Sequence, residues 1–77
     1  MTNKQIWATI ALDLKRGANY KYLGQKSKSD YYLKEAKDLY KSQEMDKNMK
    51  KIKSFIKFSG NPEDILLGSS LISVRIN

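Results

Sequence analysis

The lysines and tyrosines of this sequence are grouped in a way that favours the recognition of negatively charged partners. The 77-residue chain carries 15 Lys and Arg against 8 Asp and Glu, a formal net charge of +7. Segments 14–28 and 47–57 each hold five cations and no acid, whereas residues 30–46 hold five acids and three lysines. Cations grouped in this way attract nucleic acid, acidic protein surfaces or anionic lipid.

The residues expected to bind a partner are these cations and two tyrosines among them. The first segment supplies Lys15, Arg16, Lys21, Lys26 and Lys28, and the second supplies Lys47, Lys50, Lys51, Lys53 and Lys57. Tyr22 and Tyr31 are expected to be exposed, whereas Tyr20, Tyr32 and Tyr40 fall on apolar faces. Tyrosine beside cations can stack on bases, and it suits a protein interface equally well. We expect the two basic segments to fold together into one positive face.

Catalysis is disfavoured by what the sequence lacks. It has no histidine and no cysteine, so a base or nucleophile would have to be Asp, Glu, Lys, Tyr or Ser. Glu63 and Asp64 are neighbours, but adjacent residues on a helix point about 100° apart and do not converge. A glycine-rich phosphate loop and metal-ligand spacing are both missing. We therefore expect no enzyme, no cofactor and no metal site.

Length and hydropathy indicate one small domain covering residues 1–77, near the lower limit at which a core alone stabilises a fold. Without cysteine there is no disulfide to support it, which fits a reducing compartment. The apolar runs are far shorter than the ~20 residues of a membrane span, and the N-terminus lacks a cleavage-type motif. These features predict a cytoplasmic protein with no transmembrane segment.

The N-terminal region predicts two helices separated by a glycine. Thr2 and Gln5 have the spacing of a capping box, with Met1 expected to pack on Ile6. Apolar residues then recur at helical spacing as far as Leu14. Lys15 and Arg16 follow, and cations are typical of a helix C-terminus. Gly17 is then the expected left-handed residue that ends the helix. A short second helix is expected over 18–26, with Gly24 packed against a neighbouring backbone.

The middle of the chain predicts a turn and then two more helical stretches. Residues 27–30 are polar, with Ser29 the expected N-cap of the next helix. The apolar phase of that helix fails near residues 42–46, which favours a break or bend. A second apolar stripe starts at Met45 and continues through Met49, Ile52, Phe55 and Ile56. Residues 47–58 are expected to form a basic amphipathic helix.

The C-terminal region begins with a helix-start signal and ends ambiguously. Asn61 and Pro62 are typical of a cap and a first helical position, followed by acids in the first turn. Ile72, Val74 and Ile76 alternate, which suits a strand that could pair with its copy in a homodimer. The alternative is one helix continuing from Pro62. The expected fold is all-α, a small bundle of about four short helices built on an antiparallel helical hairpin, with a tail that is either extended or helical.

Two motifs fit the hairpin region. Tyr20, Leu23, Gly24, Ala36 and Tyr40 have a spacing that resembles a tetratricopeptide repeat, which implies a tight helical hairpin and hints at protein binding. The resemblance covers about a third of the chain. The sequence departs from that repeat at Ser27, Tyr31 and Gln43.

The same region also fits a helix-turn-helix with residues 29–39 as its recognition helix. Its acids, Asp30, Glu35 and Asp38, would face phosphate repulsion. This weakens the DNA-binding interpretation of the motif.

Two functional hypotheses follow. The first is a non-enzymatic small basic protein that docks on an acidic protein partner, as an accessory or inhibitory protein of a phage or mobile element would. The alternative is a nucleic-acid-binding regulatory protein, for DNA or RNA, that uses the same basic surfaces. Attachment to an anionic membrane surface is a third, less favoured interpretation.

Overall fold

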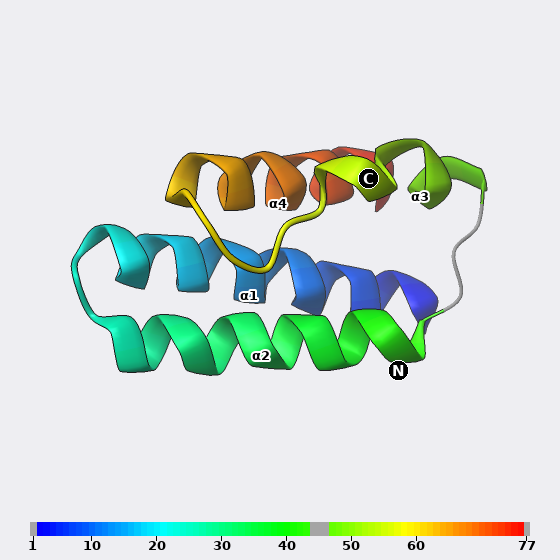
Figure 1. Cartoon of the computed structure of the whole chain (residues 1–77). Coiled ribbons are helices and arrows are strands. Elements are labelled where there is room, and N and C mark those ends of the chain that lie inside the picture. Colours follow the sequence, from blue (N-terminus) through cyan, green and yellow to red (C-terminus); the bar gives the residue numbers. More distant parts are fainter. Residues whose placement is uncertain (1, 44–46, 77) are drawn as a thin grey trace.

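The two longest helices form an antiparallel hairpin to which the rest of the chain is attached. The structure, a computed structural model, describes residues 2–43 and 47–76. In it α1 spans Asn3–Tyr22 and α2 spans Lys26–Ser42, and the two run side by side along the molecule (Figure 1). The expected all-α bundle built on a helical hairpin is confirmed.

The central element is α1, because it packs on α2 along one side and on α4, Pro62–Ile76, along another. The short helix α3, Lys47–Ile52, and the 3-10 turn η1, Lys53–Phe55, pack on α4. Residues 56–61 then cross to the start of α4 (Figure 1). The result is a compact bundle measuring 35 × 22 × 19 Å.

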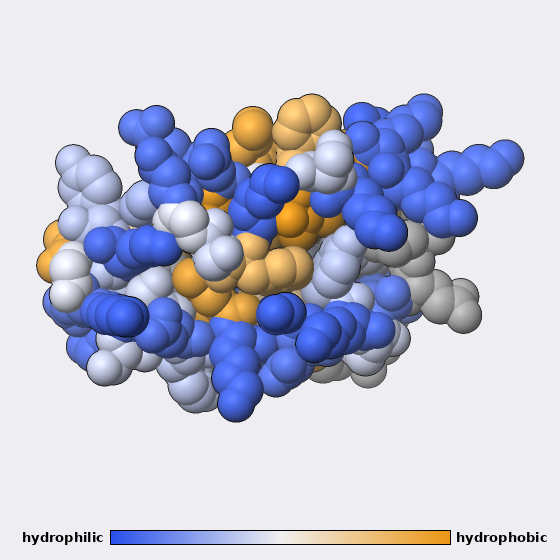
Figure 2. All heavy atoms as spheres, in the orientation of Figure 1, coloured by the Kyte–Doolittle hydropathy of each residue, from blue (hydrophilic) through white to orange (hydrophobic). Residues whose placement is uncertain are grey.

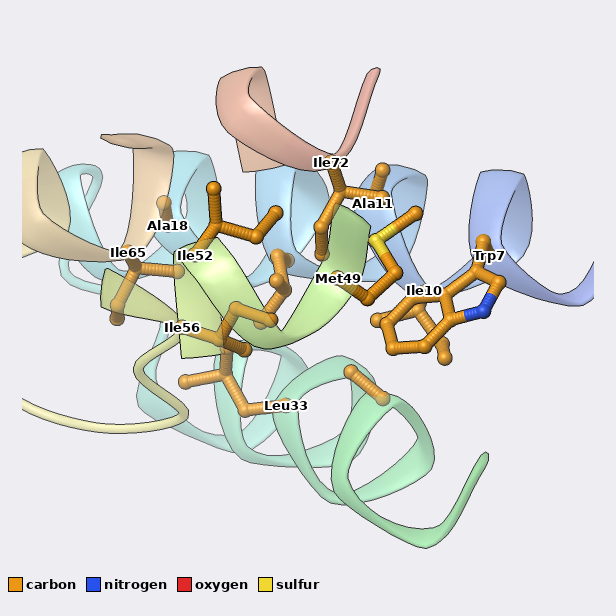
Figure 3. Close-up of a cluster of buried hydrophobic side chains, with 12 residues drawn as sticks. Trp7, Ile10, Ala11, Ala18, Leu33, Met49, Ile52, Ile56, Ile65 and Ile72 are labelled. Atoms are coloured by element: carbon orange, nitrogen blue, oxygen red, sulfur yellow. The ribbon is translucent and has the colours of Figure 1, made fainter. Parts of the chain in front are cut away.

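The core lies between the α1–α2 hairpin on one side and α3, α4 and residue 56 on the other (Figure 3). Trp7, Ile10 and Leu14 of α1 are buried. Met49 and Ile52 of α3 and Ile56 of the crossing segment belong to the same cluster (Figure 3). Its remaining members are Ala11, Ala18, Leu33, Ala36, Ile65 and Ile72. The Trp7 ring meets the Tyr40 ring edge-on, with 5.9 Å between centroids, so the first turns of α1 are joined to the last turns of α2.

The start of α1 has the predicted capping box. The Gln5 backbone N–H donates to Thr2 Oγ1 at 3.1 Å, and the Thr2 N–H donates to Gln5 Oε1 at 2.8 Å. These bonds satisfy N–H groups that have no partner within the helix. The expected contact of Met1 with Ile6 lies outside the described residues.

Helix α1 does not stop at Gly17, and the predicted second helix over 18–26 is wrong. Gly17 is buried inside α1 because α2 crosses here. A Cβ on it would lie 2.6 Å from Leu33 Cδ2 and 2.7 Å from Leu33 Cγ. The Ser29 hydroxyl donates to the Gly17 carbonyl at 2.7 Å. Gly17 is thus a packing residue, and Ser29 is a buried member of α2 rather than its N-cap.

The turn of the hairpin comes earlier than predicted, at Leu23–Gln25. Gly24 has a φ of 77°, in the left-handed region, and nothing lies within 4 Å of where its Cβ would be. The hairpin that the tetratricopeptide resemblance implies is confirmed, but the helices approach at Gly17 and not at Gly24. The helix-turn-helix interpretation is wrong, since α1 continues as far as Tyr22 and α2 folds back antiparallel to it.

The predicted break after the second long helix is confirmed, because α2 ends at Ser42 and α3 begins at Lys47. Met45 lies outside the described residues. The predicted amphipathic helix over 47–58 is too long: α3 ends at Ile52, and the chain is extended after η1. The close approach to α4 explains this, since a Cβ on Gly68 would lie 3.0 Å from the Phe55 carbonyl oxygen and 3.2 Å from Ile56 Cα.

The tail is helical. Asn61 Oδ1 accepts from the Glu63 N–H at 2.9 Å, as expected of a cap, and α4 then runs to Ile76. Ile72 is fully buried whereas Val74 is 73% exposed, which is the helical pattern and not that of one strand face. The strand alternative is therefore wrong, and a homodimer formed by pairing such strands loses its basis. The structure assigns no strand within residues 2–43 and 47–76.

Among the described helices, none combines the length and the apolar character needed to span a membrane.

Candidate functional site

All ten cations expected to bind a partner are exposed, but they do not form one face. Those of the first segment lie on the second half of α1 and the start of α2, and three of them, Lys21, Lys26 and Lys28, are beside the α1–α2 turn. Those of the second lie on α3, η1 and the crossing segment. Figure 1 places the α1–α2 turn and α3 at opposite ends of the long axis. The expected single positive face is therefore replaced by two separate basic surfaces.

The surface at the turn, called here the hairpin-end patch, consists of Lys21, Tyr22, Leu23, Lys26 and Lys28. Tyr22 is 83% exposed and Leu23 is 66% exposed, so an aromatic and an aliphatic side chain stand in solvent among three ammonium groups. Burial of these side chains against a partner would remove apolar area from water. Leu23 is exposed because α1 ends at Tyr22 and the turn begins at this residue.

The start of α2 adds to the positive character of the hairpin-end patch. Its N-cap residue, Gln25, makes no side-chain capping bond, and its first turn contains no acid. The N-terminal end of a helix carries partial positive charge on its unbonded N–H groups. An open hollow of about 240 Å³ beside it is lined by Lys21, Gly24, Lys26, Ser29 and Asp30.

The second basic surface, called here the α3 surface, consists of Lys47, Lys50, Lys51 and Lys53. Their exposed side chains surround a helix of only six residues that is followed directly by η1. Figure 2 shows hydrophilic side chains projecting at this end, with apolar surface towards the middle of the molecule. Lys57 lies apart from them in the crossing segment. Across residues 2–43 and 47–76, no salt bridge neutralises any of the ten cations.

Arg16 and Tyr31 belong to a row of rings along the hairpin. Tyr32 stacks on Tyr20 with 5.7 Å between centroids, and Tyr31 meets Tyr32 edge-on at 5.2 Å. The Arg16 guanidinium lies over the Tyr32 ring at 5.7 Å, and Lys28 Nζ lies over Tyr20 at 5.3 Å. Tyr31 itself is 64% exposed, as predicted. Tyr31 and Arg16 are therefore both exposed residues that contact the ring of Tyr32.

Lys15 lies on the side of α1 that faces α4. It borders a shallow groove between α1 and α4, about 390 Å³ in volume, whose other lining includes Leu12, Ser73 and Ile76. It therefore does not share a surface with its sequence neighbour Arg16.

One charged residue that the sequence analysis overlooked is Asp13, which is only 3% exposed. Its Oδ2 is buried and has no hydrogen-bond partner. The pKa of this carboxyl is raised from 3.8 to about 6: burial makes the largest contribution, the nearby carboxylate of Glu35 adds to it, and Arg16 opposes the shift. A signal was present in the sequence, since Asp13 lies between Ile10 and Leu14 and four residues before Gly17, on the face that meets α2.

Comparison of the chain with protein-family models, with curated proteins and with solved structures finds no significant match. The hairpin-end patch offers exposed ammonium groups, an exposed ring and a helix N-terminus, all of which bind anionic or carboxylate-bearing partners.

Proposed function

We propose that this protein is a non-enzymatic adaptor or inhibitor that docks on an acidic surface of a protein partner through the hairpin-end patch. One observation carries the proposal: Tyr22 and Leu23 stand exposed on the same turn that gathers Lys21, Lys26 and Lys28. Protein interfaces combine a buried aromatic or aliphatic centre with charged groups around it.

In this proposal the lysines and the apolar side chains of the hairpin-end patch have different roles in binding. The lysines attract an acidic partner over a distance of about 8–10 Å at physiological ionic strength and speed the encounter. Tyr22 and Leu23 then supply apolar area that is lost from water on contact. Lys28, one of these lysines, also has its Nζ over the Tyr20 ring at 5.3 Å.

Nucleic-acid binding by the same cations is the second candidate, and the observation that favours it is the absence of salt bridges to them in the described residues. Two separate basic ends, rather than one continuous basic groove, favour the protein partner. A phosphate backbone is best followed by an uninterrupted row of cations and stacking rings.

The test is affinity capture from nuclease-treated extract of the native host, comparing the wild type with K21Q/K26Q/K28Q. We expect the wild type to retain a protein of acidic composition, and the triple variant to retain at least tenfold less. K34Q/K37Q/K41Q is the matched control, since it removes three exposed lysines from the middle and end of α2 and leaves the turn intact. Equal loss in both variants would show a general charge effect and contradict a defined patch.

A salt titration with fluorescent duplex and single-stranded oligonucleotides separates the two candidates. Binding through several phosphate contacts predicts a log–log slope near −0.9 per contact on duplex DNA. Tight binding with such a slope, abolished by K21Q/K26Q/K28Q, would replace the protein partner with nucleic acid. No binding at low salt would leave the protein partner as the candidate.

A further inference from the structure

The α1–α2 interface contains a carboxylate without a partner. Asp13 and Gly17 lie four residues apart, so they share the face of α1 that Leu33 of α2 contacts. The Asp13 side chain is almost completely buried there, and its Oδ2 accepts no hydrogen bond. A buried charge without a partner costs free energy, which the protonated acid avoids.

The charged groups around Asp13 do not compensate for that cost. From α2 the half-buried Glu35 faces it, a second negative charge when ionised. From α1 itself Arg16 acts in the opposite direction, but its guanidinium lies over the Tyr32 ring and it is exposed to solvent. From α4 the polar contact with this part of α1 is the Ser69 hydroxyl, which donates to the Ala11 carbonyl at 2.6 Å. The charged residues of α4 (Glu63, Asp64 and Arg75) and the lysines of α3 are exposed.

Helix α2 has a single helical neighbour. Among the described helices it packs on α1 alone, and the ring contact of Tyr40 with Phe58 attaches it to the crossing segment. Repulsion between the carboxylates of Asp13 and Glu35 across the α1–α2 interface therefore weakens the packing of α2 on α1.

We propose that the α1–α2 interface is a proton-controlled latch, in which α2 closes tightly on α1 when Asp13 is protonated and loosens when Asp13 and Glu35 are both charged. This regulation is independent of the proposed partner. The Asp13 carboxyl has its pKa raised in the folded chain from 3.8 to about 6. The folded state therefore binds the proton more tightly than the unfolded state. The contribution of Asp13 to the free energy of unfolding is largest below about pH 4 and falls as the pH rises to about 6. Above about pH 6 this contribution is lost, and the packing of α2 on α1 remains weaker.

The test is amide hydrogen exchange by NMR on the wild type, D13N, E35Q and D38N, corrected for intrinsic rates. In the wild type we expect the protection of α2 amides to fall between pH 4.5 and pH 7 by about tenfold to twentyfold relative to α4 amides. A carboxyl whose pKa rises from 3.8 to about 6 on folding allows at most about a 25-fold fall over this pH range. D13N should remove most of this fall, and E35Q should reduce it. D38N removes an exposed α2 carboxylate and should leave it unchanged.

Two results would overturn the latch. One is a D13N or E35Q profile identical to that of the wild type. The other is an equal response of α2 and α4 amides, which would show that the proton acts on the whole fold and not on α2. Neither result depends on a binding partner, so the latch and the proposed function fail separately.

Discussion

Single residues determine how closely the two long helices approach, and Gly17 has the largest influence. Glycine lowers helix stability by about 1 kcal/mol relative to alanine, and from the sequence it is typical of a helix end. Here Leu33 occupies the space of the missing Cβ, and Ser29 bonds to the Gly17 carbonyl. The packing and the hydrogen bond offset the low propensity, so the helix continues.

Gly17→Ala should therefore destabilise the protein although alanine is the better helix former. The new methyl group would overlap Leu33, a cost of about 1–3 kcal/mol for overpacking, against a propensity gain of about 1 kcal/mol. Urea unfolding followed by circular dichroism measures the net change. Asn19→Ala, on the exposed side of α1, is the control and should be neutral or stabilising.

The same prediction has an internal check. In an L33A background the space opposite residue 17 is empty, so adding G17A should cost little or should stabilise. A full and additive cost of G17A in both backgrounds would contradict the contact with Leu33.

The identity of an element depends on what it packs against, as the C-terminal helix shows. The alternation of residues 72, 74 and 76 fits a strand, and the signal at Asn61 and Pro62 fits a helix. In the structure Ile72 is completely buried in the core, whereas Val74 is exposed, so the segment is helical. A strand would have placed both side chains on one face.

Ile72→Ser and Val74→Ser test this assignment as a matched pair. We expect Ile72→Ser to destabilise by about 2–5 kcal/mol, because it removes a fully buried side chain and buries a hydroxyl. Val74→Ser should change stability by no more than about 0.5 kcal/mol. Thermal melting of both variants gives the comparison. Equal losses would be the result expected of a strand with both residues on its buried side.

At the scale of the whole molecule, the charge distribution is the feature with a measurable consequence. The net charge is +7, and no salt bridge in the described part of the chain neutralises the cations at either end. Mutual repulsion within such a protein opposes the compact state, and dissolved salt screens it.

The melting temperature should therefore rise by several degrees between 10 mM and 300 mM NaCl at pH 7. The variant K47Q/K50Q/K51Q lowers the charge of the α3 surface and should show a smaller rise from a higher starting value. Differential scanning calorimetry at constant pH measures both. A melting temperature that falls with salt in the wild type would mean that attractive pairs, and not repulsion, dominate.

Local sequence patterns correctly predict the all-α class, the capping box at Thr2, the break after residue 42, the start signal at Asn61 and the exposure of Tyr22 and Tyr31. These features depend on local hydrogen bonding and on apolar periodicity, which neighbouring residues establish. Long-range packing is the reason that α1 continues past Gly17, that the tail is helical, that Asp13 is buried and that the basic segments lie at opposite ends. Each of these depends on a contact between residues far apart in the chain, such as Leu33 at Gly17 or the approach of Ile56 to Gly68, and a contact of that kind outweighs the local preference of the residues it joins.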